Sequence, residues 1–173
     1  MNIYLNIFIL IVLLSLFSFL SLAPFVPTKN SDLIRLLKII NLKKGEKFLE
    51  IGCGTGKVSL FFAKNFPQNE IVGIELSPLF YIISKIKVFF SGLKNIKIVY
   101  GNAMKLDFSK FDIFYVFGLP ETVTNKLSPK LEREMKDTSR FYSYCFKMSN
   151  DKFDEVRHKE SSVLNSIYEY KIK

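Results

Sequence analysis

The 173-residue sequence predicts an α/β domain, a parallel sheet with helices on both faces. Two observations support this fold class. Short apolar runs typical of strands alternate along the chain with segments whose apolar residues recur at helical spacing. A glycine-rich turn, "GCGTG" at residues 52–56, separates the first such run from the first helical segment. We therefore expect one domain, which occupies residues 47–173.

Four runs define the first half of this domain. "KFLEI" predicts a strand at 47–51, "KVSLFFAKNF" a helix at 57–66, and "EIVGIEL" a strand at 70–75. "LFYIISKIKVFF" predicts a helix at 79–91 that is apolar around much of its circumference, more than one buried face requires. Two explanations remain open for this excess of apolar residues. The helix packs closely under a small sheet, or Phe89 or Phe90 contacts lipid or a membrane partner.

The second half continues the alternation, with strands expected at 96–100 and 111–117, a helix at 121–135 and a strand at 139–146. The tail "SSVLNSIYEYKIK" is expected to form a final edge strand or a hairpin. Residues 24–46 precede the domain as a proline-containing connector and a short amphipathic helix, "DLIRLLKIINL", which Ser31 is expected to cap.

Residues 3–22 contain no charged side chain. Twenty helical residues rise about 30 Å, the thickness of the hydrocarbon core of a bilayer. A cleaved signal peptide is the alternative, but no basic residue precedes the run, and cleavage after Ala23 would fall before Pro24. We therefore expect residues 1–23 to form a retained single-pass transmembrane anchor.

The charges that follow the run predict its orientation. Between positions 29 and 47, six basic residues stand against Asp32 and Glu46. Because basic residues stay on the cytoplasmic side, the domain is expected in the cytoplasm, at the plasma membrane of a prokaryote or the inner mitochondrial membrane of a eukaryote.

Composition narrows the partners further. The net charge is +9, but the lysines are scattered and form no single aromatic-interleaved patch, so nucleic acid is not expected and an anionic lipid leaflet is the simpler partner. Cys53, Cys145 and His158 are too few and too far apart for a metal site or a disulfide framework, so both thiols are expected to be reduced and buried.

The glycine turn fits one class of nucleotide best. A triphosphate loop requires glycine at the position of Ile51 and a hydroxyl at the position of Val58. A dinucleotide loop requires its third glycine where Lys57 stands. What remains, glycine at every second position after Glu50, suits a ligand without a pyrophosphate. The sequence therefore predicts an S-adenosylmethionine site.

Carboxylates at the ends of the first two strands complete this site. Glu75 follows the glycines by about 20 residues, where it can accept both ribose hydroxyls. Glu50 can hold the glycine loop and face the cationic methionine end of the cofactor. Ligands on parallel sheets bind at the carboxyl ends of the strands, where Asn102 would also lie. The predicted cofactor-binding residues are Glu50, Ile51, Gly52, Cys53, Gly54, Gly56, Glu75, Leu76, Asn102 and Ala103.

The segments "APFVPT", "LEIGCGTGKVSLFFAK", "VGIELSPLFYIISKIKVFFSGL" and "FDIFYVFGLPETVTNKLSPKLEREM", in this order, resemble the single-pass mitochondrial protein-lysine methyltransferases and their prokaryotic homologues. The resemblance covers about residues 23 to 148. It implies a Rossmann-like class I methyltransferase sheet behind one transmembrane helix. Known members methylate lysines of the adenine nucleotide translocase and of the ATP synthase c subunit. Asn102 departs from the Asp often found after the third strand, although an Asn oxygen can still accept from the adenine amino group.

The acceptor must be deprotonated before it attacks. A lysine with a pKa near 10.4 is neutral only about one part in a thousand at cytoplasmic pH, a cost of roughly 4 kcal/mol. We expect Phe117, Leu119 and Pro120 to form an apolar wall that offsets this cost, and Glu121 to orient the ammonium.

Three functions follow as hypotheses. The first is a membrane-anchored protein-lysine N-methyltransferase acting on a membrane protein. The second is a methyltransferase of a lipid headgroup or a quinone, which the same anchor would serve. The third is a non-catalytic nucleoside-binding module, and Asn102 is its only support.

Overall fold

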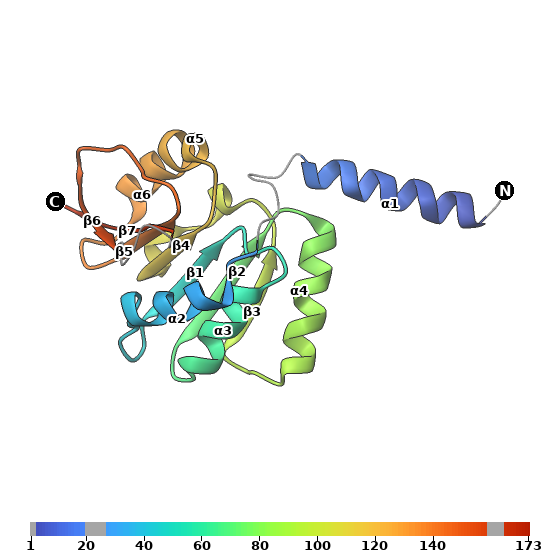
Figure 1. The fold of residues 1–173 in the computed structure, drawn as a ribbon, viewed down its shortest axis with the longest axis horizontal. Helices are drawn as coiled ribbons and strands as arrows, with labels where there is room; N and C mark the ends of the chain where they lie inside the picture. The colour runs from blue at the N-terminus through green and yellow to red at the C-terminus, as the bar shows by residue number, and fades with distance from the viewer. Residues whose placement is uncertain (1–2, 20–26, 159–164) are drawn as a thin grey trace.

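The computed structural model describes residues 3–19, 27–158 and 165–173. Figure 1 shows one sheet between two helical layers, with the N-terminal helix extending away from the domain. The expected α/β architecture is confirmed.

Seven strands among the described residues form the sheet in the order β3-β2-β1-β4-β5-β7-β6. The first five are parallel to one another, whereas β7 is antiparallel to both β5 and β6. Their bounds are β1 Lys47–Ile51, β2 Glu70–Glu75, β3 Ile96–Tyr100, β4 Ile113–Val116, β5 Arg140–Tyr144, β6 Phe153–His158 and β7 Ile167–Ile172. The expected bounds of β1, β2 and β3 are correct to the residue.

The end of the sheet differs from the prediction in two ways. The tail strand β7 is not at the edge, because it pairs with β5 on one side and β6 on the other; of the two expected alternatives, its antiparallel pairing with the preceding strand β6 agrees with a hairpin. The edge strand β6 was not predicted. Its side chains after Phe153 are exposed or partly exposed, so it lacks the buried apolar positions that mark a strand in a sequence. The sheet is consequently mixed rather than parallel throughout.

Helices pack on both faces of the sheet. One face is covered by α2 (Asn30–Ile39), α3 (Lys57–Asn65) and α4 (Pro78–Ser91). The other is covered by the 3₁₀ turns η1 (Ala103–Lys105) and η2 (Phe108–Lys110) and by a helical run. This run consists of α5 (Pro120–Thr122), a π-helical turn η3 (Val123–Leu127) and α6 (Ser128–Glu134), and it matches the helix expected at 121–135. Neighbouring residues of β1 point to opposite faces, Phe48 into one core and Leu49 into the other.

A buried ion pair fixes α2 to the sheet. Arg35 Nη1 donates to Asp32 Oδ1 over 2.7 Å, and the hydroxyl of Tyr144 on β5 donates to Asp32 Oδ2 over 2.6 Å. The predicted cap at Ser31 is wrong. The helix begins at Asn30, the preceding Lys29 makes no side-chain cap, and Ser31 lies inside the first turn. The backbone amides of Asp32 and Leu33 both donate to the carbonyl oxygen of Lys29, so the first turn begins before Ser31.

The N-terminal helix α1 spans Ile3–Phe19, 17 residues. This is shorter than the expected segment 3–22, whose last three residues lie outside the described residues, as do the connector residues up to 26. In the described part of the chain, no helix has both the length and the hydropathy needed to cross a membrane.

Candidate active site

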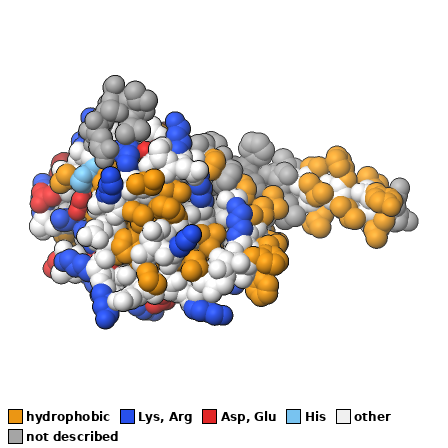
Figure 2. Space-filling model, turned by 60° about the horizontal axis from the view of Figure 1, so that its bottom comes forward, with side chains coloured by type: hydrophobic (Ala, Val, Ile, Leu, Met, Phe, Trp, Pro, Cys, Tyr) orange, Lys and Arg blue, Asp and Glu red, His pale blue; other side chains and the backbone are white. Residues whose placement is uncertain are grey.

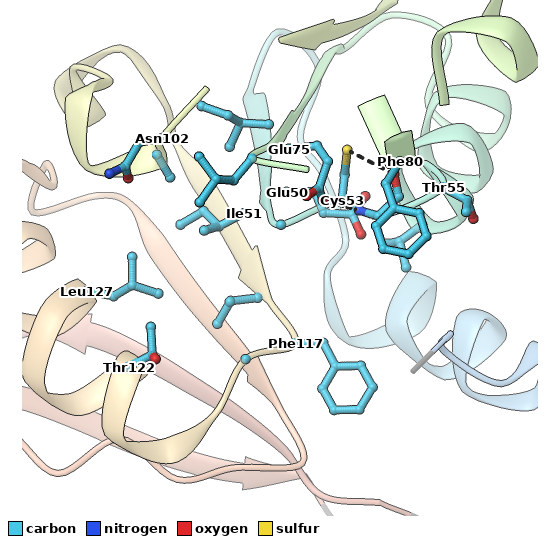
Figure 3. Close-up of a pocket in the computed structure, with 18 of the residues that line it drawn as sticks. Glu50, Ile51, Cys53, Thr55, Glu75, Phe80, Asn102, Phe117, Thr122 and Leu127 are labelled. Atoms are coloured by element: carbon cyan, nitrogen blue, oxygen red, sulfur yellow. Dashed lines mark hydrogen bonds between the residues drawn. The ribbon is translucent and has the colours of Figure 1, made fainter. Parts of the chain in front are cut away.

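A cavity of about 260 Å³ opens at the carboxyl ends of β1, β2, β3 and β4 (Figure 3). The segments that follow these strands form its wall, at residues 50–55, 74–76, 101–104 and 116–118. Placing these four segments at one edge is a property of parallel strands, and the site was expected there on that ground. Four of the predicted site residues do not line the cavity: Gly56, Leu119, Pro120 and Glu121.

The glycine loop turns back against β2. The amides of Gly52 and Cys53 both donate to the carbonyl oxygen of Ile74, at 2.9 and 3.0 Å. Gly52, Gly54 and Gly56 have φ angles of 73°, 54° and 74°, in the left-handed region that favours glycine. A Cβ placed on Gly52 would meet nothing within 4 Å, so the loop leaves open space for a ligand that approaches the backbone.

Gly56 has a packing role. A Cβ there would lie 3.2 Å from Cβ of Ser84 on α4. The prediction that Gly56 contacts the cofactor is therefore not supported by its position. Glycine is required at this position because the start of α3 passes close to α4.

Glu50 lies at the end of β1 and is buried. Its Oε2 accepts hydrogen bonds from the backbone amide of Ser59, at 2.8 Å, and from the Ser59 hydroxyl. Burial raises the pKa of Glu50 to about 8, although the Ser59 hydrogen bonds oppose this shift. Glu50 thus holds α3 rather than the glycine loop, and it presents a carboxyl group that a nearby cation would ionise.

Glu75, at the end of β2, is the residue that holds the glycine loop. Its Oε2 accepts from the amide of Gly54 and its Oε1 from the amide of Ser77, each over 2.7 Å. A carboxylate offers about four lone-pair sites, so both oxygens can also accept from ligand hydroxyls. Its position on the cavity wall is the one expected for ribose recognition.

Cys53 is a packing residue of the loop. It is buried, and burial raises the pKa of its thiol well above the ordinary value, so the thiolate does not form at neutral pH. The expectation that both thiols are buried holds for Cys53 and fails for Cys145, which is partly exposed.

Asn102 follows β3 and caps the turn η1. Its Oδ1 accepts from the amide of Met104 at 2.9 Å, and this bond brings Ala103 and Met104 onto the cavity wall. The side chain of Asn102 is exposed at the rim. Its contact with adenine remains a prediction, and its cap explains why an amide oxygen suffices at this position.

The wall beyond β4 is aromatic. Phe117 packs edge-on against Tyr144 with ring centroids 4.8 Å apart, and its ring lies 6.4 Å from that of Phe146. The expected apolar wall at Phe117 is thus present on the cavity. Leu119 and Glu121 are exposed and do not line it, whereas Thr122 and Lys126, one helical turn apart, do.

The connector before α2 also reaches the cavity, which sequence reasoning missed. Pro27 and Thr28 line it, and Lys57 Nζ donates to the carbonyl oxygen of Thr28 over 2.5 Å. Phe80 on α4 is a further lining residue that was not predicted. The only sequence signal was the segment "APFVPT", which predicted a linker rather than a wall.

Comparison with known proteins places this site in a family. A model of the ANTKMT methyltransferase domain matches residues 50–155, which is more than half of the chain. The chain belongs to the ANTKMT methyltransferase family. This family assignment agrees with the resemblance found in the sequence.

Two relatives and one solved structure define the similarity. A protein-lysine N-methyltransferase of Saccharolobus islandicus (strain REY15A) is 29% identical over 157 residues, 90% of this chain and 97% of the relative. A demethylmenaquinone methyltransferase of Geobacillus stearothermophilus is 33% identical over 88 residues, 49% of this chain and 38% of the relative. An RNA methyltransferase from Salinibacter ruber, solved with S-adenosyl-L-homocysteine, has the same fold, with a TM-score of 0.76 and 21% identity over 85% of this chain and 94% of that one.

The chain is therefore an S-adenosylmethionine-dependent methyltransferase, EC 2.1.1.-. The hypothesis of a non-catalytic module is wrong. The residues fit the cofactor, because the loop is open at Gly52 and two buried carboxyl groups, Glu50 and Glu75, stand on the wall where a cation and hydroxyls would be recognised.

Proposed function

We propose that this methyltransferase acts on the ε-amino group of lysine in a membrane protein. The observation that carries the proposal is the extent of similarity. The match to the protein-lysine N-methyltransferase of Saccharolobus islandicus runs over 90% of the chain, whereas the match to the demethylmenaquinone methyltransferase stops at 49%. About half a domain suffices to share a cofactor site, but an acceptor site requires more of the fold.

The rim of the cavity suits a lysine acceptor. When bound, S-adenosylmethionine supplies a methyl group carried on a sulfonium, and positioning provides most of the rate enhancement. Phe117 gives the acceptor an apolar, aromatic surface, which lowers the pKa of an ammonium by desolvation. Lys126 also lines the cavity, and its positive charge disfavours a second one and so acts in the same direction.

Anchoring by the N-terminal helix belongs to the same proposal. All described side chains from Ile3 to Val12 are exposed, and none is charged. An exposed apolar surface of this kind marks a site that contacts a membrane or another protein, and the uncharged run favours the membrane. We place the domain on the cytoplasmic side, on the basis of the basic residues at positions 29–47.

Tritiated S-adenosylmethionine and native membranes test the acceptor. After incubation with the enzyme, the membranes are separated into protein and lipid fractions, and acid hydrolysis of the protein identifies methyl-lysine. Gly54→Arg, which fills the glycine loop, serves as the inactive control. Label in methyl-lysine supports the proposal. Label confined to the lipid fraction would instead establish a headgroup or quinone methyltransferase.

A further inference from the structure

Helix α4 carries an apolar face that no described part of the domain covers. Phe89 and Phe90 are 80% and 81% exposed, and Ile82 and Ile86 are 51% and 52% exposed. Residues spaced by three, four and seven or eight positions share one face of a helix, so these four side chains lie together. Ser84, on the opposite side of α4, is buried against the domain.

Basic residues border this face, and α4 contains no acidic residue. Lys85 and Lys87 fall on either side of the apolar stripe at helical spacing, and both are exposed. Lys94 follows the end of the helix and is also exposed. A lysine can extend its ammonium past an apolar surface to reach phosphate groups, so this arrangement is typical of a helix that lies in a lipid interface.

The N-terminal helix lies next to α4. Helix α1 contacts α4, and it extends from the same side of the domain in Figure 1. Figure 2 shows hydrophobic side chains, with Lys or Arg side chains beside them, on the side of the domain from which α1 projects. A bilayer is the partner that would cover both helices at once, because lipid accommodates apolar surface of any outline and attracts the lysines to anionic headgroups.

We propose that α4 lies flat in the interface of an anionic leaflet, with Phe89 and Phe90 inserted between the acyl chains. Lys85 and Lys87 bind lipid phosphates at the two borders of the face. This docking goes beyond the methylation reaction. It does not depend on lysine as the acceptor, nor on α1 crossing the membrane.

Tryptophan fluorescence tests the docking in the full-length protein. The chain contains no tryptophan, so Phe89→Trp and Phe90→Trp each introduce a single reporter at a position exposed enough to accept it. Val156→Trp is the matched control, because Val156 is 51% exposed on the edge strand β6, at the end of the sheet away from α4. The probe is a vesicle of phosphatidylcholine and phosphatidylglycerol, with and without brominated acyl chains.

We expect vesicles to shift the emission of the tryptophans at positions 89 and 90 to shorter wavelength, and brominated lipid to quench it. The tryptophan at 156 should show neither effect. Lys85→Gln and Lys87→Gln together should weaken vesicle binding, read from the position-89 signal, by about twenty-fivefold, since each lysine near an anionic surface contributes about a fivefold factor. Unchanged cofactor binding in every variant would show that the fold and the methyltransferase site are intact.

Three results would overturn the docking. Brominated lipid could leave the tryptophans at 89 and 90 unquenched, whether or not the protein sediments with the vesicles. The tryptophan at 156 could be quenched equally. A blue shift that depends on protein concentration in the absence of lipid would assign the face to a second copy of the chain. None of these results changes the identity of the labelled fraction, so failure of the docking and failure of the lysine acceptor are distinguishable.

Discussion

Glu50 is expected to lose a proton when S-adenosylmethionine binds. Burial raises the pKa of this carboxyl group to about 8, so at pH 7 it is mainly protonated in the free enzyme. The cofactor brings an ammonium and a sulfonium, and a positive charge beside Glu50 favours the carboxylate. Binding should therefore be coupled to proton release, with affinity that increases as pH rises.

The magnitude follows from the pKa. Ionising a group one pH unit below its pKa costs about 1.4 kcal/mol, so the cost is roughly 1.4 kcal/mol at pH 7 and twice that at pH 6. The apparent affinity should consequently increase about tenfold between pH 6 and pH 7. Affinities are compared only below pH 7.5, because the α-amino group of the cofactor itself titrates at about 7.7–8.0 and would add its own pH dependence.

Titration calorimetry in buffers of different ionisation enthalpy measures both the affinity and the number of protons released. We expect close to one proton at pH 6 for the wild type and none for Glu50→Gln, whose affinity should be flat over this range. Glu121→Gln is the matched control, since Glu121 is exposed and off the cavity wall. A wild-type affinity independent of pH, with no proton released, would refute the assigned role of Glu50.

The same pKa determines how the free enzyme responds to pH. The pKa of Glu50 in the folded protein, about 8, lies above its ordinary value of 4.5, so protonation of Glu50 stabilises the folded state. This contribution is fully present below about pH 4.5 and is lost as pH rises through 8. Thermal unfolding should show that cofactor stabilises the enzyme more at pH 7.5 than at pH 6.

Three further predictions concern single residues. Gly73→Ala should destabilise the fold by about 1–3 kcal/mol, because its Cβ would lie 2.9 Å from Cys53 Sγ; thermal unfolding measures this, and an unchanged midpoint would contradict the tight approach. Asp32→Asn should cost about 3–5 kcal/mol by leaving Arg35 without its buried carboxylate, and adding Arg35→Met should recover part of the loss in denaturant unfolding. Phe117→Ala should shift the pH–rate profile of protein methylation to higher pH with little change in cofactor affinity, whereas a lower rate at an unmoved profile would argue against desolvation.

Strands in the middle of the sheet could be predicted from the sequence because burial on both faces makes them continuous apolar runs. In β1 and β2 every residue after the first is buried. In β6, by contrast, only Phe153 is buried, so pairing with β7 rather than composition makes it a strand. The amphipathic helix α2 was predicted, but it begins at Asn30 rather than after Ser31, with the amides of Asp32 and Leu33 donating to the carbonyl oxygen of Lys29.

The residues of the site also differ in whether local sequence predicts them. Glu50, Glu75 and the glycine loop were predictable because local spacing fixes them relative to the strand ends. Thr28 could not be predicted, because its contact at the cavity is a hydrogen bond from Lys57, 29 residues away in sequence. Glu121 does not line the cavity, because Thr122, Lys126 and Leu127 are the residues of that run that face it.

Helix α4 connects the two proposals. Leu76, just before α4, and Phe80, in its first turn, line the methyltransferase cavity. Phe89 and Phe90 lie at the other end of the helix. A helix of 14 residues is about 21 Å long, so α4 lying in a leaflet would hold the cavity within one helix length of the lipid surface. A lysine close to the membrane surface could then reach the site, while one far out on a soluble domain would need the enzyme to leave the bilayer. Confinement of this kind raises the local concentration of membrane acceptors without any contact to them. The apolar face of α4 would thereby select the acceptor by its depth in the membrane, and a cavity without a large protein-binding surface would be sufficient for specificity.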